Sequence, residues 1–247
     1  MREAPPDRYV AYTCVTGGYD RLLQSPFAGN VSEMDLVCFC DEKRQAWPSS
    51  MTLPLASPPR LQSGHDVNRY HKVYPHRLLS AYRYSIYLDG NIRYEGDPRE
   101  LIDTLEASGA SVGIFRHPGG RTLEEEVLAC EEHKKFDRFD RARVDKQIEH
   151  YKQEGFDIGA VIGANYLMVR DHMAPALPTA MALWWSQLFE FSKRDQLSLL
   201  YSLWKAGVCW IFLDEDGGLP PERVIRTGHY RSPWRRVRER VRTLYMR

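Results

Sequence analysis

Short apolar segments alternate with segments of helical composition through the first half of the chain. The clearest apolar segment is YVAYTCVT, from Tyr9 to Thr16, which is rich in β-branched and aromatic residues and ends at Gly17-Gly18. The other strand candidates are Asp35 to Cys40, Tyr84 to Leu88, Ser111 to Phe115, Tyr166 to Arg170 and Trp210 to Leu213. This alternation is typical of βαβ units, so the sequence predicts an α/β fold with a mostly parallel central sheet.

Two of the helix candidates begin with recognisable capping residues. Asp97 is a predicted N-cap with Pro98 at the first helical position, and Thr122 with Glu125 predicts a capping box. Composition predicts further helices over residues 65–74, 141–154, 180–191 and 194–205. Prolines and serines between Trp47 and Gly64 predict a loop there.

Composition excludes several classes of protein. Hydrophobic residues make up 43% of the chain and aromatic residues 12%, which is enough for a packed core. A net charge of +1 argues against a dedicated nucleic-acid-binding protein. The sequence contains no run of eighteen apolar residues, so it predicts no membrane span. The first residues lack the apolar stretch of a signal peptide. We therefore expect a cytoplasmic protein, with its five cysteines reduced and buried.

The motifs of several common enzyme classes are missing. The sequence contains no GxxxxGK[ST], GxGxxG, HExxH or GxSxG. P-loop phosphoryl transfer, dinucleotide binding, zinc proteolysis and serine hydrolysis are therefore disfavoured.

Polar residues follow three of the predicted strands, at Thr16 to Asp20, at Asp41-Glu42 and at Asp89 to Asn91. Ligands bind at the carboxyl ends of strands in parallel sheets, so these segments are candidate site residues. Asp89 and Asn91 flank a glycine and could hold a hard divalent cation, Mg²⁺ or Mn²⁺. The alternative is an ordinary Asp-Gly-Asn turn of a hairpin.

Cations precede this motif in the segment NRYHKVYPHRLL. Arg69, Lys72, His76 and Arg77 could supply charge-assisted donors to a diphosphate. The alternative is a solvated basic face of a helix, although the interleaved tyrosines weaken it.

The segment FSKRDQLSLLYSLWKAG presents an apolar face at helical spacing, which favours a core helix. Asp195 and Gln196 stand at its start. They are candidates for catalysis or acceptor binding, and Asp195 could equally serve only to favour the positive end of the helix.

Six segments in order resemble a glycosyltransferase-like family, formerly a domain of unknown function. Its members occur in plant mucilage-related proteins, some labelled ceramidases, and in bacterial proteins regarded as glycosyltransferases. The segments are TGGYD, DLVCFCDE, RYHKVYPHRLL, YSIYLDGNI, FRHPGGRTLEEEV and RDQLSLLYSLWKAG. The resemblance covers about four fifths of the chain, from Tyr9 to Gly207.

The resemblance implies a GT-A fold, a Rossmann-like sheet that binds a nucleotide sugar through a DxD-like metal motif. On this basis Thr16, Gly17, Tyr19 and Asp20 would line the nucleotide pocket, and Asp41 would contact the base or ribose. Arg69 and Lys72, with His76 nearby, would approach the diphosphate. Asp89 and Asn91 match the DxD position, where Asn91 makes one ligand neutral. His117 matches a recurring histidine of the family.

The C-terminal segment differs in charge from the rest of the chain. Residues 226–247 contain eight Arg and one Glu, which leaves the body mildly acidic. We therefore divide the chain into a single GT-A-like catalytic domain, 1–225, and a basic tail, 226–247. The tail suits an anionic membrane surface or a lipid-linked acceptor; alternatively it packs on the acidic body or over the diphosphate. Within it, His229 loosely resembles a C-terminal metal ligand of GT-A enzymes, against the alternative of a structural histidine.

These features together predict a metal-dependent hexosyltransferase. It would use a nucleotide-diphosphate sugar, with UDP as the nucleotide, and a glycan, lipid-linked or small-molecule acceptor. A bound cation with Lys72 or Arg69 would stabilise the leaving diphosphate, and Asp195 is the candidate carboxylate at the reacting sugar. The alternatives are a lipid amide hydrolase, which the ceramidase label suggests, and a catalytically silent nucleotide-sugar-binding module.

Overall fold

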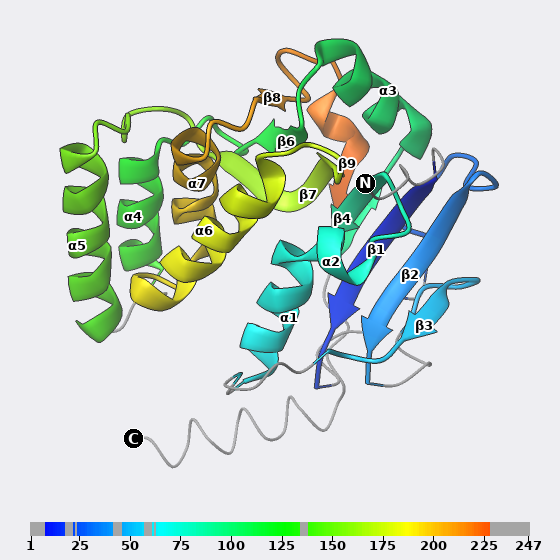
Figure 1. The fold of residues 1–247 in the computed structure, drawn as a ribbon, viewed down its shortest axis with the longest axis horizontal. Helices are drawn as coiled ribbons and strands as arrows, with labels where there is room; N and C mark the ends of the chain where they lie inside the picture. Colours follow the sequence, from blue (N-terminus) through cyan, green and yellow to red (C-terminus); the bar gives the residue numbers. More distant parts are fainter. Residues whose placement is uncertain are drawn as a thin grey trace.

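A computed structural model describes residues 8–17, 22, 24–41, 46–56, 61, 63–133 and 138–227. Within these residues, seven strands form one central sheet and two short strands form a second (Figure 1). The strands are β1 (Tyr9–Val15), β2 (Met34–Cys40), β3 (Met51–Leu53), β4 (Tyr84–Leu88), β5 (Ile92–Tyr94), β6 (Val112–Arg116), β7 (Gly163–Asp171), β8 (Trp210–Phe212) and β9 (Val224–Arg226). The helices are α1 (Gly64–Val73), α2 (Pro75–Leu78), α3 (Pro98–Ser108), α4 (Leu123–Glu132), α5 (Arg138–Gln153), α6 (Leu177–Glu190) and α7 (Leu199–Lys205), with 3₁₀ turns at Asp195–Leu197 and Pro221–Arg223.

The central sheet has the strand order β3-β2-β1-β4-β7-β6-β8. β7 is antiparallel to its neighbours β4 and β6, whereas the other neighbouring pairs are parallel. Both β1 and β4 are buried along their whole length, as their continuous apolar sequences allow for strands covered on both faces. The predicted α/β fold with a mostly parallel central sheet is confirmed.

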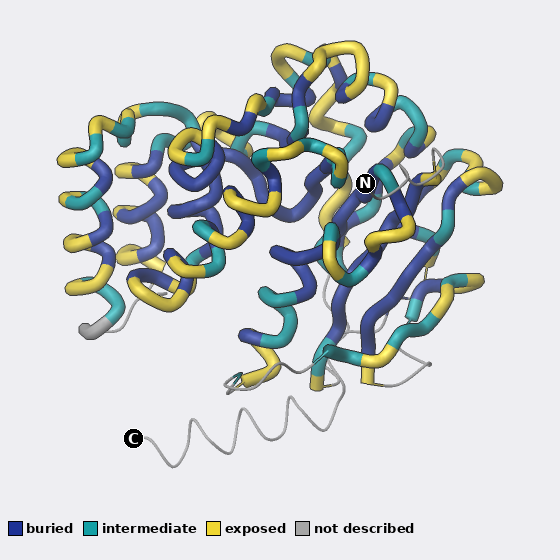
Figure 2. The backbone as a smooth tube through the Cα atoms, in the orientation of Figure 1, coloured by how far each residue is buried: buried dark blue, intermediate teal, exposed yellow. Residues whose placement is uncertain are grey.

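Helices cover both faces of this sheet and create a core on each side. Tyr9 and Ala11 of β1 point into a cluster with α3, whereas Val10 and Tyr12 point into a cluster with α1, α6 and α7. A smaller cluster joins α4, α5 and α7 beside the sheet. Figure 2 shows the buried inner faces of these helices and their exposed outer faces.

The predicted helix starts are confirmed. The Asp97 carboxylate accepts from the backbone N–H of Arg99 at 2.8 Å, with Pro98 at the first helical position of α3. At α4, the Thr122 hydroxyl accepts from the backbone of Glu125, and the Glu125 carboxylate accepts from the backbone of Thr122.

Two local predictions were wrong, and one alternative is excluded. The loop predicted over residues 47–64 contains the edge strand β3, which pairs with β2. The helix predicted over 194–205 is divided into a 3₁₀ turn and α7, which separates Asp195 from the helix. The Asp-Gly-Asn turn is no hairpin, because β5 pairs with β9 in the second sheet while β4 stays in the central one.

None of the five cysteines, all of which lie within the described residues, is in a disulfide; four are buried, as expected, whereas Cys209 is exposed. Cys38 and Cys40 face the same core cluster, as their spacing on a strand requires. Among the described residues, no helix combines the length and apolar character that a membrane crossing needs.

Candidate active site

The polar residues that follow the parallel strands meet at one edge of the central sheet. Thr16 follows β1, Asp41 follows β2, Asp89 follows β4 and His117 follows β6. Because β7 runs the opposite way, its first residues, including Asn165, reach the same edge. This is the edge at which ligands of parallel α/β sheets bind.

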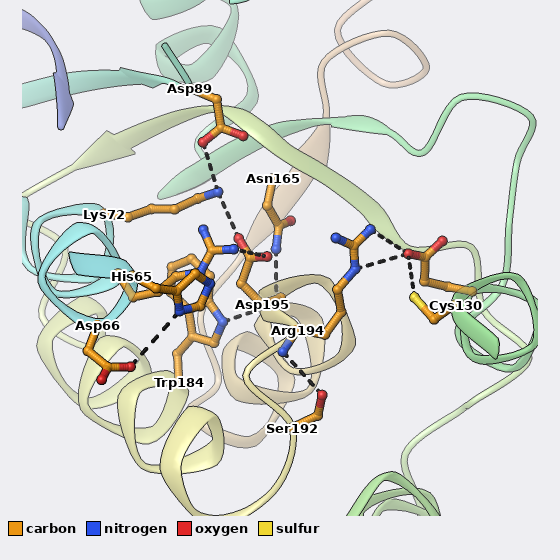
Figure 3. Close-up of polar contacts among 12 residues, drawn as sticks. His65, Asp66, Lys72, Asp89, Cys130, Asn165, Trp184, Ser192, Arg194 and Asp195 are labelled. Atoms are coloured by element: carbon orange, nitrogen blue, oxygen red, sulfur yellow. Dashed lines mark hydrogen bonds and ion pairs between the residues drawn. The ribbon is translucent and has the colours of Figure 1, made fainter. Parts of the chain in front are cut away.

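A buried cluster of ion pairs lies at the centre of this edge. Lys72 Nζ lies 2.7 Å from Asp195 Oδ2 and 3.4 Å from Asp89 Oδ1, so the ammonium group bridges two carboxylates (Figure 3). Arg69, one turn earlier in α1, approaches Asp195 Oδ1 at 3.2 Å. The structure thus brings together four residues that are far apart in the sequence: Arg69, Lys72, Asp89 and Asp195.

Lys72 is held from several sides. Its side chain is only 2% exposed, and Nζ lies 4.9 Å from the centre of the Tyr87 ring. Its backbone carbonyl accepts from Arg170 Nη1 at 2.7 Å and from the Tyr12 hydroxyl at 3.2 Å. The carboxylates of Asp89 and Asp195 and the ring of Tyr87 compensate the ammonium group for its lost hydration, and the bonds to the carbonyl fix the backbone.

Asp195 is a carboxylate that is charged at neutral pH. Burial raises its pKa, but Arg69 and Lys72 outweigh that effect and hold the pKa well below its usual value. A carboxylate with a strongly lowered pKa is a weak base. The geometry therefore favours Asp195 as the counter-ion that orients Arg69 and Lys72.

The backbone of Asp195 is also fixed. Its carbonyl accepts from Asn165 Nδ2 at 3.0 Å and from the indole N–H of Trp184 at 3.2 Å (Figure 3). Sequence reasoning missed both donors. Asn165 is a polar residue directly before the buried residues 166–169 of β7, which is a signal that could have identified it.

Asp89 is the accessible carboxylate of the cluster. Its side chain is 36% exposed, and its Oδ1 accepts from the Tyr87 hydroxyl at 2.7 Å. The backbone N–H of Asp89 donates to the carbonyl of Tyr166 at 2.8 Å, which fixes the turn after β4. Asn91 lies in that turn, and its carbonyl accepts from the backbone N–H of Thr227 at 2.8 Å.

Gln196, the residue after Asp195, is 9% exposed. Among the described residues, its buried Oε1 has no hydrogen-bond partner. A buried amide oxygen without a partner can accept a hydrogen bond, and a ligand could donate that bond.

His117 lies farther along the edge. Its Nε2 is 3.6 Å from Oε2 of Glu126, a fully buried carboxylate of α4. Burial lowers the pKa of His117 despite that carboxylate.

Thr16, Gly17 and Asp41 form a second group on this edge, at the start of α1. The Thr16 hydroxyl donates to the carbonyl of Gly64 at 3.0 Å, and the backbone N–H of Gly17 donates to the Asp41 carboxylate. Gly17 has a φ of 60°, in the left-handed region that favours glycine. The rise of α1 from Gly64 to Lys72 is about 12 Å, so one helix joins the two groups.

His76 does not join either group. Its ring packs beside Tyr74 and close to Arg170 and His172, and His172 Nε2 lies 2.8 Å from the hydroxyl of Ser85, toward the opposite end of β4. Burial lowers the pKa of His76 to about 4, so the ring is neutral at pH 7. The other predicted site residues, Tyr19, Asp20 and His229, lie outside the described residues.

The fit of a divalent cation rests on Asp89 and Asn91. No group of three or more His, Cys, Asp or Glu side chains that could hold a metal ion occurs in the described part of the chain. The exposed Asp89 carboxylate and the Asn91 amide would supply two oxygen ligands. Mg²⁺ commonly binds through one or two carboxylates and completes its coordination with water and substrate phosphates.

The family model described as "TOD1/MUCI70, glycosyltransferase-like domain" matches residues 63–212, more than half of the chain. The matched segment runs from the start of α1 to the end of β8. It contains the whole ion-pair cluster.

A relative from Arabidopsis thaliana, the probable hexosyltransferase MUCI70, is 26% identical over 136 residues. The match covers 51% of this chain and 23% of the relative, so the chain spans about a quarter of that protein's length.

Two glycosyltransferases are among the similar solved structures. Mouse xyloside xylosyltransferase 1 has a TM-score of 0.49 at 12% identity, covering 83% of this chain and 84% of that one. Core-mannan synthase A from Aspergillus fumigatus, in a form with Mn and GDP, has a TM-score of 0.44 at 11% identity, covering 84% of this chain and 75% of that one.

Proposed function

Because the chain belongs to the TOD1/MUCI70 glycosyltransferase-like domain family, we propose that it transfers a hexose from a nucleotide-diphosphate sugar to an acceptor hydroxyl. UDP is the proposed nucleotide. The observation that carries the proposal is the buried Lys72–Asp195–Arg69 cluster beside the accessible carboxylate of Asp89. The matched hexosyltransferase from Arabidopsis thaliana supports the class of sugar.

The nucleotide would bind at the ends of β1 and β2. Thr16 and Gly17 would border the pocket, with Tyr19 and Asp20 from the same loop, and Asp41 would accept from the ribose or the base. The ordered contacts of Thr16 with Gly64 and of Gly17 with Asp41 support a pocket that is formed before the ligand arrives.

The diphosphate would meet the positive charge at the end of α1. Arg69 is the more accessible cation, with its side chain 17% exposed, while Lys72 lies deeper. The fully buried guanidinium of Arg170 adds positive charge behind Lys72. Cleavage of the sugar–phosphate bond increases the negative charge on the leaving diphosphate, which cations in a buried site stabilise more than in water.

The metal ligands in this proposal are Asp89 and Asn91, with His229 from the tail. Mn²⁺ or Mg²⁺ bound there would act as a Lewis acid on the phosphate oxygens. Lys72 already lies 3.4 Å from Asp89 Oδ1, so an ion at that oxygen would compete with an ammonium group. We therefore expect the ion to bind together with the diphosphate, whose charge offsets the repulsion.

Asp195, Gln196 and His117 are the proposed groups near the reacting sugar. Asp195 would hold Arg69 and Lys72 in place, and the free oxygen of Gln196 would accept from a sugar hydroxyl. His117 would lie toward the donor sugar.

Isothermal calorimetry with UDP, GDP and their sugars, with and without Mn²⁺, tests this proposal. Asp89→Ala should abolish the part of the affinity that depends on Mn²⁺. Asp103 is an exposed aspartate of α3, and Asp103→Ala should leave that part of the affinity unchanged. Absence of nucleotide binding under every condition would reject the proposal. Binding without turnover across a panel of acceptors would favour a silent binding module, and amide release from ceramide independent of nucleotide would favour a lipid amide hydrolase.

The basic tail extends the proposal to the acceptor. Its first residue, Arg226, still belongs to the fold, pairing with Ile92 in the second sheet and lying over the ring of Tyr166. Residues 228–247 lie outside the described part. We propose a cytoplasmic protein that meets the inner face of the membrane, and a lipid-linked acceptor, through this tail. Liposome flotation of the full chain against one truncated at Gly228 tests this role, and equal flotation would reject it.

A further inference from the structure

Glu126 is a fully buried carboxylate in a sequence, LEEEVL, that by itself resembles an exposed acidic helix. Its Oε2 lies 3.1 Å from Arg121 Nη1 and 3.6 Å from His117 Nε2. Its Oε1 accepts from the Cys130 thiol at 3.4 Å and from Arg194. Burial raises the pKa of Glu126, but Arg194 and Arg121 outweigh that effect and keep the carboxylate charged.

The position of this carboxylate is fixed by its own helix. Glu126 lies one residue after the capping box that Thr122 and Glu125 form. Two backbone hydrogen bonds hold the loop before α4 against the residue that precedes β7. The N–H of Ile162 donates to the carbonyl of Arg121, and the N–H of His117 donates to the carbonyl of Ile162. The carboxylate therefore presents a rigid acceptor to the segment that packs on α4.

That segment begins with Arg194. Its Nε and Nη2 both donate to Glu126 Oε1, at 3.1 and 2.6 Å, and its backbone N–H donates to the Ser192 hydroxyl at 3.1 Å. Arg194 precedes Asp195 directly, and its carbonyl accepts from Leu197 to close the 3₁₀ turn. Figure 3 shows Arg194 directed away from the Asp195 carboxylate.

Charge explains why this direction matters. Asp195 already pairs with Arg69 and Lys72, and a third cation at its carboxylate would compete with both. Glu126 pairs with Arg194 and holds its guanidinium on the α4 side, from where Arg194 acts on Asp195 only through space. The carboxylate of Asp195 then remains available to the two cations of α1.

We propose that Glu126 is a positioning residue for the transfer reaction, acting through Arg194 to set the backbone and charge environment of Asp195. This inference rests on the proposed function, because its kinetic effect presumes a diphosphate leaving group at Arg69 and Lys72. Glu126 also lies 3.6 Å from His117 Nε2, but its hydrogen bonds toward Asp195 run through Arg194. Its removal should lower kcat more than it raises KM, because the interactions that Asp195 orients strengthen as charge develops on the leaving group.

A double-mutant cycle tests the pathway from Glu126 to Asp195. Glu126→Gln should reduce kcat by about 10- to 100-fold, the effect of a small misplacement in a site. Arg194→Met should cause a similar loss, and the double variant should be no worse than either, since one interaction is removed in each case. Glu126→Asp, which keeps the charge, should retain more activity than Glu126→Gln. Glu124→Gln, an exposed neighbour on the same helix, is the matched control.

Hydrogen exchange of the peptide that spans residues 192–198 gives a readout independent of activity. Exchange should rise in Glu126→Gln and in Arg194→Met and stay unchanged in Glu124→Gln. If Glu126→Gln does not fold, Arg194→Lys removes the fork of donors while the carboxylate stays, and the same increase is expected.

Failure of the two proposals is distinguishable. A wild-type chain that neither binds nor converts nucleotide sugars rejects the proposed function, while hydrogen exchange still tests the positioning role. An active wild type whose kcat and exchange are unchanged by Glu126→Gln overturns this inference alone. Losses in kcat that multiply in the double variant also overturn it, because Glu126 would then act independently of Arg194.

Discussion

Replacing Asp195 by asparagine should destabilise the protein strongly without changing the shape of the side chain. Asp195 is 3% exposed and lies 2.7 Å from Lys72 and 3.2 Å from Arg69. At an effective dielectric constant of about 20, each pair is worth about 5–6 kcal/mol of Coulomb attraction, part of which is offset by the desolvation of the carboxylate. Breaking a buried ion pair by removing one partner costs about 3–5 kcal/mol, and we expect Asp195→Asn to fall in that range.

Urea unfolding at pH 7, followed by far-UV circular dichroism, measures this loss. Asp103→Asn is the control, because the Asp103 side chain is 57% exposed in its pair with Arg99, and exposed pairs contribute at most about 1 kcal/mol. A variant Asp195→Asn as stable as the wild type would refute the reasoning, since the buried cations would then need no carboxylate.

The same comparison has a defined pH dependence. The pKa of Asp195 is lower in the folded state than in the unfolded state, because Arg69 and Lys72 outweigh its burial. Its contribution to stability is therefore complete above the unfolded pKa of about 3.9 and is lost as the pH falls below that value. The difference between wild type and Asp195→Asn should thus be constant near neutrality and shrink below about pH 4.

Three further changes test other parts of the fold. Gly113→Ala should lower the free energy of unfolding by about 1–3 kcal/mol in urea, because the new Cβ would lie 2.8 Å from Cδ2 of Leu213. Trp184→Phe should cost about 0.5–1.5 kcal/mol for the lost hydrogen bond in the same assay, because the carbonyl of Asp195 loses its indole donor and keeps Asn165. Burial lowers the pKa of His172 to about 3, so unfolded chains take up a proton there between pH 6.5 and 3 that folded chains do not. The free energy of unfolding should therefore decrease as the pH falls from 6.5 to 3, and it should decrease less steeply in His172→Gln. Equal slopes in the two proteins would show that His172 does not cause this pH dependence.

Much of the fold could be predicted because it depends on local patterns. Continuous apolar segments such as Tyr9–Val15 predict buried strands, and capping residues such as Asp97 and Thr122 predict helix starts. β5 and β9 could not be predicted, because each is three residues long and pairs across more than a hundred residues of chain. A short strand has little local pattern, and its partner defines it.

Part of the candidate site followed from the same patterns. Polar residues after the strands identified the edge where Asp89 and Asp41 lie. The pairing of Asp195 with α1 and the burial of Glu126 were not visible, because the charge of a side chain carries no information about its distant partners. His76 was predicted to bind the diphosphate because cations surround it in the sequence. In the folded chain it packs beside Tyr74 and near Arg170, away from the site.

Local sequence patterns were enough to predict the class of fold, the family resemblance and the edge of the sheet that carries the polar residues, since hydrophobic pattern and turn residues act over short spans of chain. The position of Lys72 between Asp89 and Asp195 and the turn of Arg194 toward Glu126 depend instead on the folded chain. Ion pairs form between whichever charged groups the packing of the core brings within reach, and in a buried site their strength depends on the exclusion of water that the completed fold provides.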